Sequence, residues 1–218
     1  MAASPTVLVT GFKPFDVDAI NPSWEVARAL DGWHPSGARV HAVELSCVFG
    51  RAMAQLAEAI DQRQPQLIIC LGLAAGCNEV SVERVAINID DARIPDNDGQ
   101  QPVDNAIVAE GPSAYFSTLP IKAIVRDLRA AGLPSGVSNT AGTFVCNHVF
   151  YGLMHKLTQH SDAIRGGFIH LPCLPEQAEL HPGAPTLPLD VQIQAIRKAI
   201  ETALVVDVDV RETAGKLH

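Results

Sequence analysis

Short, almost continuously apolar runs recur along the chain and alternate with segments of helical spacing. Apolar runs of this length, closed by Gly or Pro, are typical of strands buried on both faces of a sheet. The pattern predicts strands at 6–10, 39–46, 66–72, 135–138 and 166–171, a long strand or hairpin at 79–90, and helices at 22–30, 48–62, 120–131, 146–158 and 188–204. Residues 91–118 are rich in Pro, Gly, Asn and Asp and are predicted to form a long, functional loop.

The alternation of strands and helices predicts an α/β fold with helices on both faces of a sheet. We expect one domain over residues 1–218, a three-layer α/β/α sandwich around a largely parallel or mixed central sheet. No internal repeat and no linker divides the chain. Ligands of such folds bind beyond the carboxyl ends of the strands, so candidate chemistry is sought there.

Charge and hydropathy narrow the possible partners. The net charge of -8 argues against a nucleic-acid partner, which requires a basic surface. No stretch approaches the roughly 20 apolar residues that span a bilayer, so no membrane partner is expected. The N-terminus lacks the basic and apolar regions of a signal peptide, and we expect a cytoplasmic protein.

The five cysteines are Cys47, Cys70, Cys77, Cys146 and Cys173. Their odd number and the absence of a C-x-x-C pair argue against a disulfide framework and against a structural zinc site. We expect neither a metal nor another cofactor.

Cys146 stands where an irregular stretch, 138–148, enters the helix predicted at 146–158. A thiol in the first turn of a helix lies at the positive end of the helix dipole, which lowers its pKa. Thr140 and Thr143 are candidate caps of this helix. The alternative is a buried cysteine that serves only as a small apolar side chain.

His170 ends an apolar strand just before Pro172, at the position where a sheet delivers catalytic groups. A core histidine bonded to the backbone is the alternative. His148 is closer to Cys146 in sequence, but residues two apart on a helix do not face each other. His170 is therefore the better candidate base.

Glu83 lies within the apolar 79–90 segment, where an unpaired carboxylate would be costly. It can orient a histidine and stabilise its imidazolium. Alternatively, it pairs with Arg84 or reaches water at a sheet edge. Glu79 is a second candidate carboxylate in a less regular stretch.

Arg93 is a cation in the otherwise acidic stretch DARIPDNDG. It can hold a developing oxyanion or a carboxylate. A local salt bridge with Asp90, Asp91 or Asp96 is the alternative.

Phe12, Phe15 and Phe144 lie in segments beside these polar candidates. Aromatic side chains in such positions either line a ligand pocket or cover the core. The stretch GFKPF carries no glycine-rich phosphate signature, so a nucleotide site is not supported.

Several long blocks, in order from about residue 6 to 177, resemble pyroglutamyl peptidase I, the family of pyrrolidone-carboxylate peptidases. They read TGFKPF followed by NPS, ERVAIN, DARIPDN, GPSAYFSTLP, SNTAGTFVCNHVFYGLMH and GFIHLPCLPEQ. Blocks of this length in a fixed order are far more specific than a single short motif.

The resemblance implies a role for each matching residue. Cys146 would be the nucleophile, His170 the general base and acid, Glu83 the carboxylate that orients it, and Arg93 a support for the oxyanion. The remaining residues implied by the resemblance belong to the substrate pocket: Phe12, Phe15 and Phe144 over the pyroglutamate ring, and Asn21 as a support of the first loop.

The resemblance further implies a cysteine peptidase that hydrolyses the amide bond after an N-terminal pyroglutamyl residue of a peptide, through a thioester acyl-enzyme. It suggests a homo-oligomer, often a tetramer. The alternatives are a hydrolase of another small cyclic or acyl amide, and a non-catalytic α/β protein that binds a small ligand.

One stretch departs from the family. Relatives commonly read GQAGG after the third strand, whereas residues 72–76 here read GLAAG. We expect Leu73 to lie at the substrate pocket in place of the glutamine. Cys47, Cys70, Cys77 and Cys173 are expected to be structural.

Overall fold

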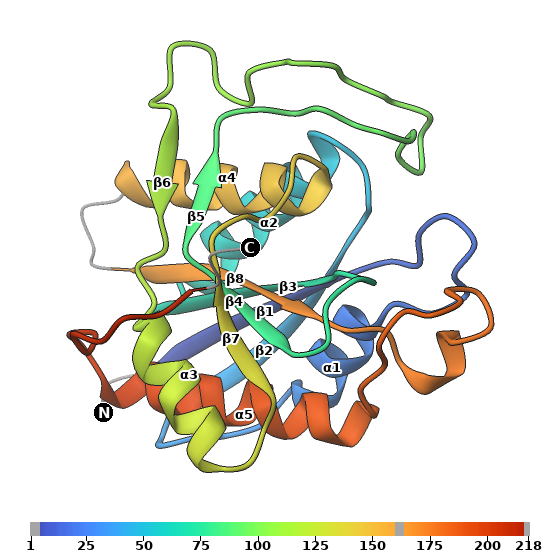
Figure 1. Ribbon diagram of the computed structural model, residues 1–218. Coiled ribbons are helices and arrows are strands. Elements are labelled where there is room, and N and C mark those ends of the chain that lie inside the picture. Colours follow the sequence, from blue (N-terminus) through green and yellow to red (C-terminus); the bar gives the residue numbers. More distant parts are fainter. Residues whose placement is uncertain (1–4, 160–163, 216–218) are drawn as a thin grey trace.

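Six strands form the central sheet of the computed structural model, which describes residues 5–159 and 164–215 (Figure 1). Their order is β2-β1-β3-β8-β4-β7, and every neighbouring pair is parallel except β8 with β4. The strands are β1 (Thr6–Phe12), β2 (Arg39–Leu45), β3 (Leu67–Leu73), β4 (Val80–Glu83), β7 (Ser135–Ser138) and β8 (Arg165–Leu171). The sheet is therefore mixed and largely parallel, as predicted.

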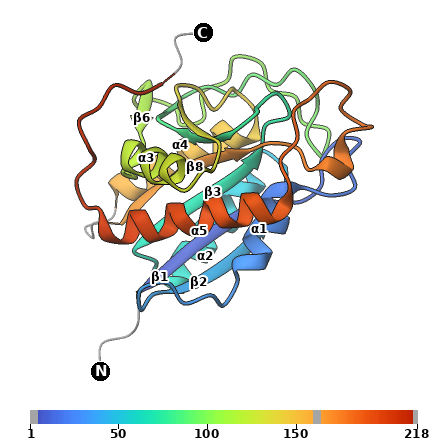
Figure 2. The ribbon, with the colours of Figure 1, turned by 60° about the horizontal axis from the view of Figure 1, so that its bottom comes forward.

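Helices cover both faces of the sheet. Figure 1 shows α2 (Arg51–Arg63) and α4 (Val145–Thr158) on one face, with α3 (Ile121–Ala130) and α5 (Leu189–Val205) on the other. The turned view in Figure 2 shows α5 lying across the sheet on the same face as α1 (Pro22–Leu30). The three-layer α/β/α architecture is confirmed. Among the described helices, none is both long and apolar enough to cross a bilayer.

Two separate cores explain why the strands are so uniformly apolar. Along β3, Leu67, Ile69 and Leu71 contribute to the core under α1, α3 and α5. Ile68 and Cys70 contribute to the core under α2 and α4. A strand whose side chains alternate between two covered faces has no position for a solvated polar residue. A polar side chain in such a strand therefore has a specific reason to be there.

The same alternation fixes the direction of two polar side chains. On β8, Ile169 and Leu171 belong to the core under α5, so Phe168 and His170 point to the α4 face. On β4, Val80 and Val82 belong to the α5 side. Glu83 consequently points, like His170, toward α4.

The predicted long strand or hairpin at 79–90 is wrong. β4 stays in the central sheet, but β5 (Val85–Ile87) leaves it and pairs antiparallel with β6 (Ala114–Phe116). The chain changes sheets at Arg84, whose N–H bonds to Ser138 and whose carbonyl accepts from Ser117. Residues 91–118 are accordingly not a plain loop, since they end in a strand.

Candidate active site

A histidine–carboxylate pair occupies the α4 face of the sheet. The register of the antiparallel β4–β8 pair sets Ser81 opposite His170, and Glu83 follows at the end of β4. Nδ1 of His170 lies 2.8 Å from Oε1 of Glu83, and the two side chains are 7% and 2% exposed. Because a carboxylate only accepts, Nδ1 carries the proton. Nε2 is left as the nitrogen that can exchange a proton, and no described residue hydrogen-bonds to it.

Cys146 reaches the same point from α4, where it is the second helical residue. A Cβ placed on Gly72 would lie 2.8 Å from Sγ of Cys146 and 2.8 Å from the ring of Phe168. Gly72 is the register partner of His170 in the parallel β3–β8 pair. Because Gly72 has no side chain, the thiol of Cys146 can pack against β3 at this position. The neighbouring position on β8 is His170.

The structure thus brings Cys146, His170 and Glu83 together from three elements. Among the described contacts, no hydrogen bond joins the thiol to His170. Such bonds between nucleophile and base are often long before substrate binds and tighten in the complex. Cys146 is partly exposed, whereas Cys47, Cys70 and Cys173 are buried.

The predicted lowering of the thiol pKa is wrong for the resting site. Burial raises the pKa of Cys146 well above its usual range, and Cys47, Glu83 and Cys70 raise it further. Although the residue as a whole is partly exposed, loss of hydration at the sulfur is the largest cause of the raised pKa. A thiolate therefore requires a partner that takes its proton.

The start of α4 has no capping side chain. Its N-cap residue is Phe144, and neither predicted threonine caps it. Thr143 instead donates from Oγ1 to the carbonyl of Asp91 at 2.7 Å, and Thr140 accepts from Gly142. The helix begins one residue earlier than predicted, and its cap position is the residue directly after Thr143. Its first N–H groups are left for a bound group.

A cleft of about 630 Å³ opens at the start of α4, where Phe144, two positions before Cys146, is one of its lining residues. Cys146, His170 and Glu83 are not among the residues that line it. Four predicted site residues line it: Phe15, Leu73, Arg93 and Phe144. The rings of Phe15 and Phe144 are 5.1 Å apart at 49°, and together they give the cleft an aromatic wall. The volume is within the range of small-ligand sites.

Two predicted pocket residues lie elsewhere. Phe12 is 2% exposed and belongs to the core, with its ring 6.5 Å from that of Phe168. As the last residue of β1 it follows the strand alternation inward. Asn21 does not line the cleft but caps α1 and donates from Nδ2 to the carbonyl of Lys13 at 3.1 Å. It supports the first loop, as expected.

Arg93 is exposed at the cleft. Among the described residues it forms no ion pair, so the predicted alternative of a local salt bridge is not found. Asp90 binds His148 instead, and the carboxylate of Asp96 accepts backbone N–H groups. The Arg93 guanidinium remains available to a ligand.

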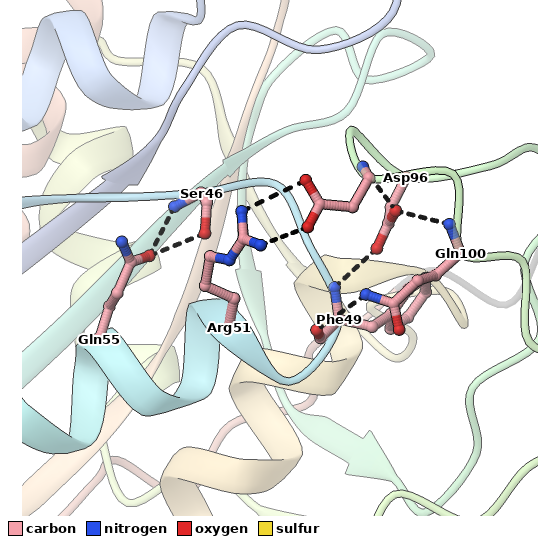
Figure 3. A network of polar contacts seen from close by, with 7 residues as sticks. Ser46, Phe49, Arg51, Gln55, Asp96 and Gln100 are labelled. Atoms are coloured by element: carbon pink, nitrogen blue, oxygen red, sulfur yellow. Dashed lines mark hydrogen bonds and ion pairs between the residues drawn. The ribbon is translucent and has the colours of Figure 1, made fainter.

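Behind the aromatic wall, Asp96 ties two loops together (Figure 3). Its carboxylate accepts from the N–H of Phe49 at 2.9 Å and of Gln100 at 2.8 Å. Phe49 in turn meets Phe144 edge to ring, with centroids 5.3 Å apart at 85°. Sequence reasoning missed this role of Asp96, because its partners lie far apart in the chain.

A thiol next to a carboxylate-bound histidine, on a mixed sheet between helical layers, defines the class as an α/β thiol hydrolase. Comparisons with known proteins specify the family. The model of the pyroglutamyl peptidase family matches residues 5–206. A pyrrolidone-carboxylate peptidase of Cupriavidus taiwanensis is 60% identical over 98% of this chain and 100% of that protein.

Solved structures agree with this result. Pyroglutamyl peptidase I from Bacillus amyloliquefaciens superposes with a TM-score of 0.94 at 47% identity, covering 96% of this chain and 100% of that one. A mutant pyrrolidone carboxyl peptidase from Pyrococcus furiosus gives 0.88 at 41% identity, covering 91% and 98%. The chain belongs to the pyroglutamyl peptidase family.

Proposed function

We propose that this protein is a cysteine peptidase that removes an N-terminal pyroglutamyl residue from peptides. The observation that carries the proposal is the 2.8 Å contact of His170 with Glu83 on the face of the sheet where the thiol of Cys146 packs over Gly72. Phe144, two residues before Cys146, lines the aromatic cleft. Membership of the pyroglutamyl peptidase family supports the choice of substrate.

Cys146 is proposed as the nucleophile. His170 takes the thiol proton as the sulfur bonds to the carbonyl carbon of the pyroglutamyl group. Burial raises the pKa of the thiol, so this transfer depends on the stability of the imidazolium. The buried carboxylate of Glu83 supplies that stability and holds the proton on Nδ1.

The tetrahedral intermediate then collapses. His170 gives its proton to the leaving amine, the carbon–nitrogen bond breaks, and a thioester remains on Cys146. His170 next removes a proton from water as the water oxygen bonds to the thioester carbon. The carbon–sulfur bond then breaks, and His170 returns the proton to the sulfur, which releases free pyroglutamate and restores the thiol. The oxyanion of both steps is proposed to lie at the uncapped start of α4, with the Arg93 guanidinium as a second source of positive charge.

Ring selectivity is proposed to come from Phe15 and Phe144. A lactam ring is flat and uncharged, and it suits a slot between aromatic side chains. A free N-terminal amine would lose its hydration there without gaining a partner. Leu73 adds an apolar side chain to the same cleft.

Assembly and compartment are further parts of the proposal. We infer a single domain, because the core under α1, α3 and α5 contains residues from all six strands of the central sheet. The family resemblance suggests a homo-oligomer, and five free cysteines suit the reducing cytoplasm.

The test is a panel of fluorogenic amides that differ only in the N-terminal group. Pyroglutamyl, prolyl and alanyl amides are offered to the reduced enzyme, and kcat/KM is measured for each. The proposal predicts turnover of the pyroglutamyl amide alone. A preference for another cyclic or acyl amide would overturn the substrate assignment and direct attention to Leu73.

A further inference from the structure

The segment 13–20, which carries Phe15, is an exposed connection between β1 and α1. Most of its residues are exposed, and Asp16 adopts a left-handed backbone with φ of 55°. Within the segment, the N–H of Asp18 bonds to the carbonyl of Phe15 at 3.2 Å. A connection with so few apolar contacts requires polar anchors to hold an aromatic ring in place.

The carboxylate of Asp18 provides such an anchor. Its side chain is only 7% exposed, although it belongs to an exposed segment. Oδ1 accepts from Nε2 of Gln177 at 2.7 Å, and Oδ2 lies 2.9 Å from Nε2 of His181. We call these three residues the Asp18 network.

The orientation of the Gln177 amide is fixed by its surroundings. Gln177 is 1% exposed and ends the 3-10 helix η1 (Pro175–Gln177). Its Oε1 accepts from the N–H of Leu174 at 2.9 Å, so Nε2 must be the group that meets the carboxylate. A buried amide with a defined donor and a defined acceptor holds its partner in one geometry.

The Asp18 network joins the aromatic wall to the strand of the base. Gln177 and His181 follow β8, which carries His170, and His181 and Asp18 line the cleft together with Phe15. The network therefore connects the loop above the cleft to the segment that leaves the catalytic strand.

We propose that Asp18 and Gln177 are positioning residues that hold Phe15 against Phe144 and thereby set the affinity for the pyroglutamyl ring. The inference rests on the proposed function. Neither residue contacts Cys146, His170 or Glu83 through any described hydrogen bond, so their effect falls on substrate binding and not on the bond-making steps.

The first variant is Gln177→Glu, which sets two carboxylates against each other. We expect KM for the pyroglutamyl amide to rise about tenfold with kcat within about twofold, the signature of lost uniform binding. The double variant Asp18→Asn/Gln177→Glu exchanges the carboxylate and the amide between the two positions. The new amide at position 18 can then donate a hydrogen bond to the new carboxylate at position 177. Its KM should return to within about threefold of wild type, because the two changes are coupled.

Gln194→Glu is the matched control, since it makes the same charge change at an exposed position of α5. It should leave KM unchanged. A purely structural role of the Asp18 network would lower Tm in Gln177→Glu without raising KM, and this result would overturn the proposal. Failure of the double variant to recover KM would do the same.

A second measurement does not depend on activity. Hydrogen exchange of the amides in segment 13–20 should accelerate in Gln177→Glu, return in the double variant and stay unchanged in Gln194→Glu. If Gln177→Glu does not fold, Asp18→Ala removes the acceptor from a surface segment and should accelerate exchange equally. Unchanged hydrogen exchange in the variants would refute the role of the Asp18 network, whatever the activity of the enzyme. A wild-type protein that is inactive toward pyroglutamyl amides would instead refute the proposed function and leave the exchange result to decide the role of the network.

Discussion

Two histidine–carboxylate pairs lie on the α4 side of the sheet, and they differ in one nitrogen. His170 meets Glu83 through Nδ1 at 2.8 Å, and His148 meets Asp90 through Nδ1 at the same distance. Both pairs are at least nine-tenths buried. Nε2 of His148, however, accepts from the N–H of Gly50 at 3.0 Å. Among the described residues, Nε2 of His170 has no such partner.

This difference supports the proposal that His148 has a structural role and that His170 is the general base. A ring with both nitrogens satisfied holds two segments together, and here His148 fixes the turn that carries Phe49. A ring with one nitrogen open can exchange a proton. Burial and a carboxylate partner are therefore not sufficient marks of a general base; an available second nitrogen is needed too.

The largest effect on activity is expected from removing the imidazole of His170, whose Nε2 has no partner among the described residues. His170→Ala should lower kcat/KM on the order of 10³ to 10⁴-fold, because both proton transfers depend on it. The matched variant His148→Ala should keep the chemistry but lower the free energy of unfolding by about 1–3 kcal/mol, since it leaves a buried carboxylate and the Gly50 N–H unpaired. Steady-state kinetics and urea unfolding of both variants measure the contrast, and an inverted pattern would assign the base to His148.

Removing the charge of Glu83 should likewise lower kcat far more than removing the charge of Asp90. Glu83→Gln removes the charge that stabilises the imidazolium and should lower kcat on the order of 10³-fold. Asp90→Asn should lower kcat less than about fivefold, because both ring nitrogens of its partner His148 already bond to protein groups. Equal losses in kcat from the two variants would show that the pairs are not distinct in function.

Gly72→Ala tests whether the thiol of Cys146 must pack against Gly72 to meet the His170–Glu83 pair. A methyl group there would lie 2.8 Å from Sγ of Cys146, so either the sulfur or the ring of Phe168 must move. We expect a loss of kcat/KM on the order of 10²-fold, as for a misplacement of about 1 Å, and a stability loss of about 1–3 kcal/mol. Wild-type kinetics in this variant would mean that the space above Gly72 is not needed.

The smallest effect is expected for Cys47 and Cys70, two thiols that have no role in the proposed mechanism. Burial raises the pKa of Cys47 and Cys70 to about 12. The unfolded chain loses these protons first, so their contribution to stability is complete below about pH 8.5 and is lost between there and about pH 12. Each contributes a slope of up to about 1.4 kcal/mol per pH unit. Denaturant unfolding of Cys70→Ala between pH 8 and 11 should show a shallower fall than wild type, with activity at neutral pH retained; an unchanged slope would contradict the raised pKa.

Local patterns were sufficient to predict most of the fold. The apolar runs located the strands of the central sheet, because strands covered on both faces carry few polar residues. The same logic made Glu83 and His170 conspicuous as polar residues in buried strands. The 79–90 segment was mispredicted because β5 pairs with β6, which lies about 30 positions further along the chain. A local sequence pattern does not indicate a pairing over that distance.

Local patterns alone could not predict which distant residues meet in space, and the grouping of Cys146, His170 and Glu83 was predicted only through the family resemblance. Asp18 and Gln177 are 159 positions apart and neither stands in an unusual local pattern. Phe12 and Phe15 look alike in sequence, yet one ends a strand and enters the core while the other lines the cleft. The thiol pKa was mispredicted for a similar reason, since the helix dipole is local and the burial is not.

The most direct test of the account is release of a fluorogenic amine from its pyroglutamyl amide by wild type, Cys146→Ala and Cys47→Ala side by side. We predict turnover by wild type and by Cys47→Ala, and none above background in Cys146→Ala. Retained turnover in Cys146→Ala would show that another group attacks the amide and that the arrangement of Cys146, His170 and Glu83 is not the catalytic centre.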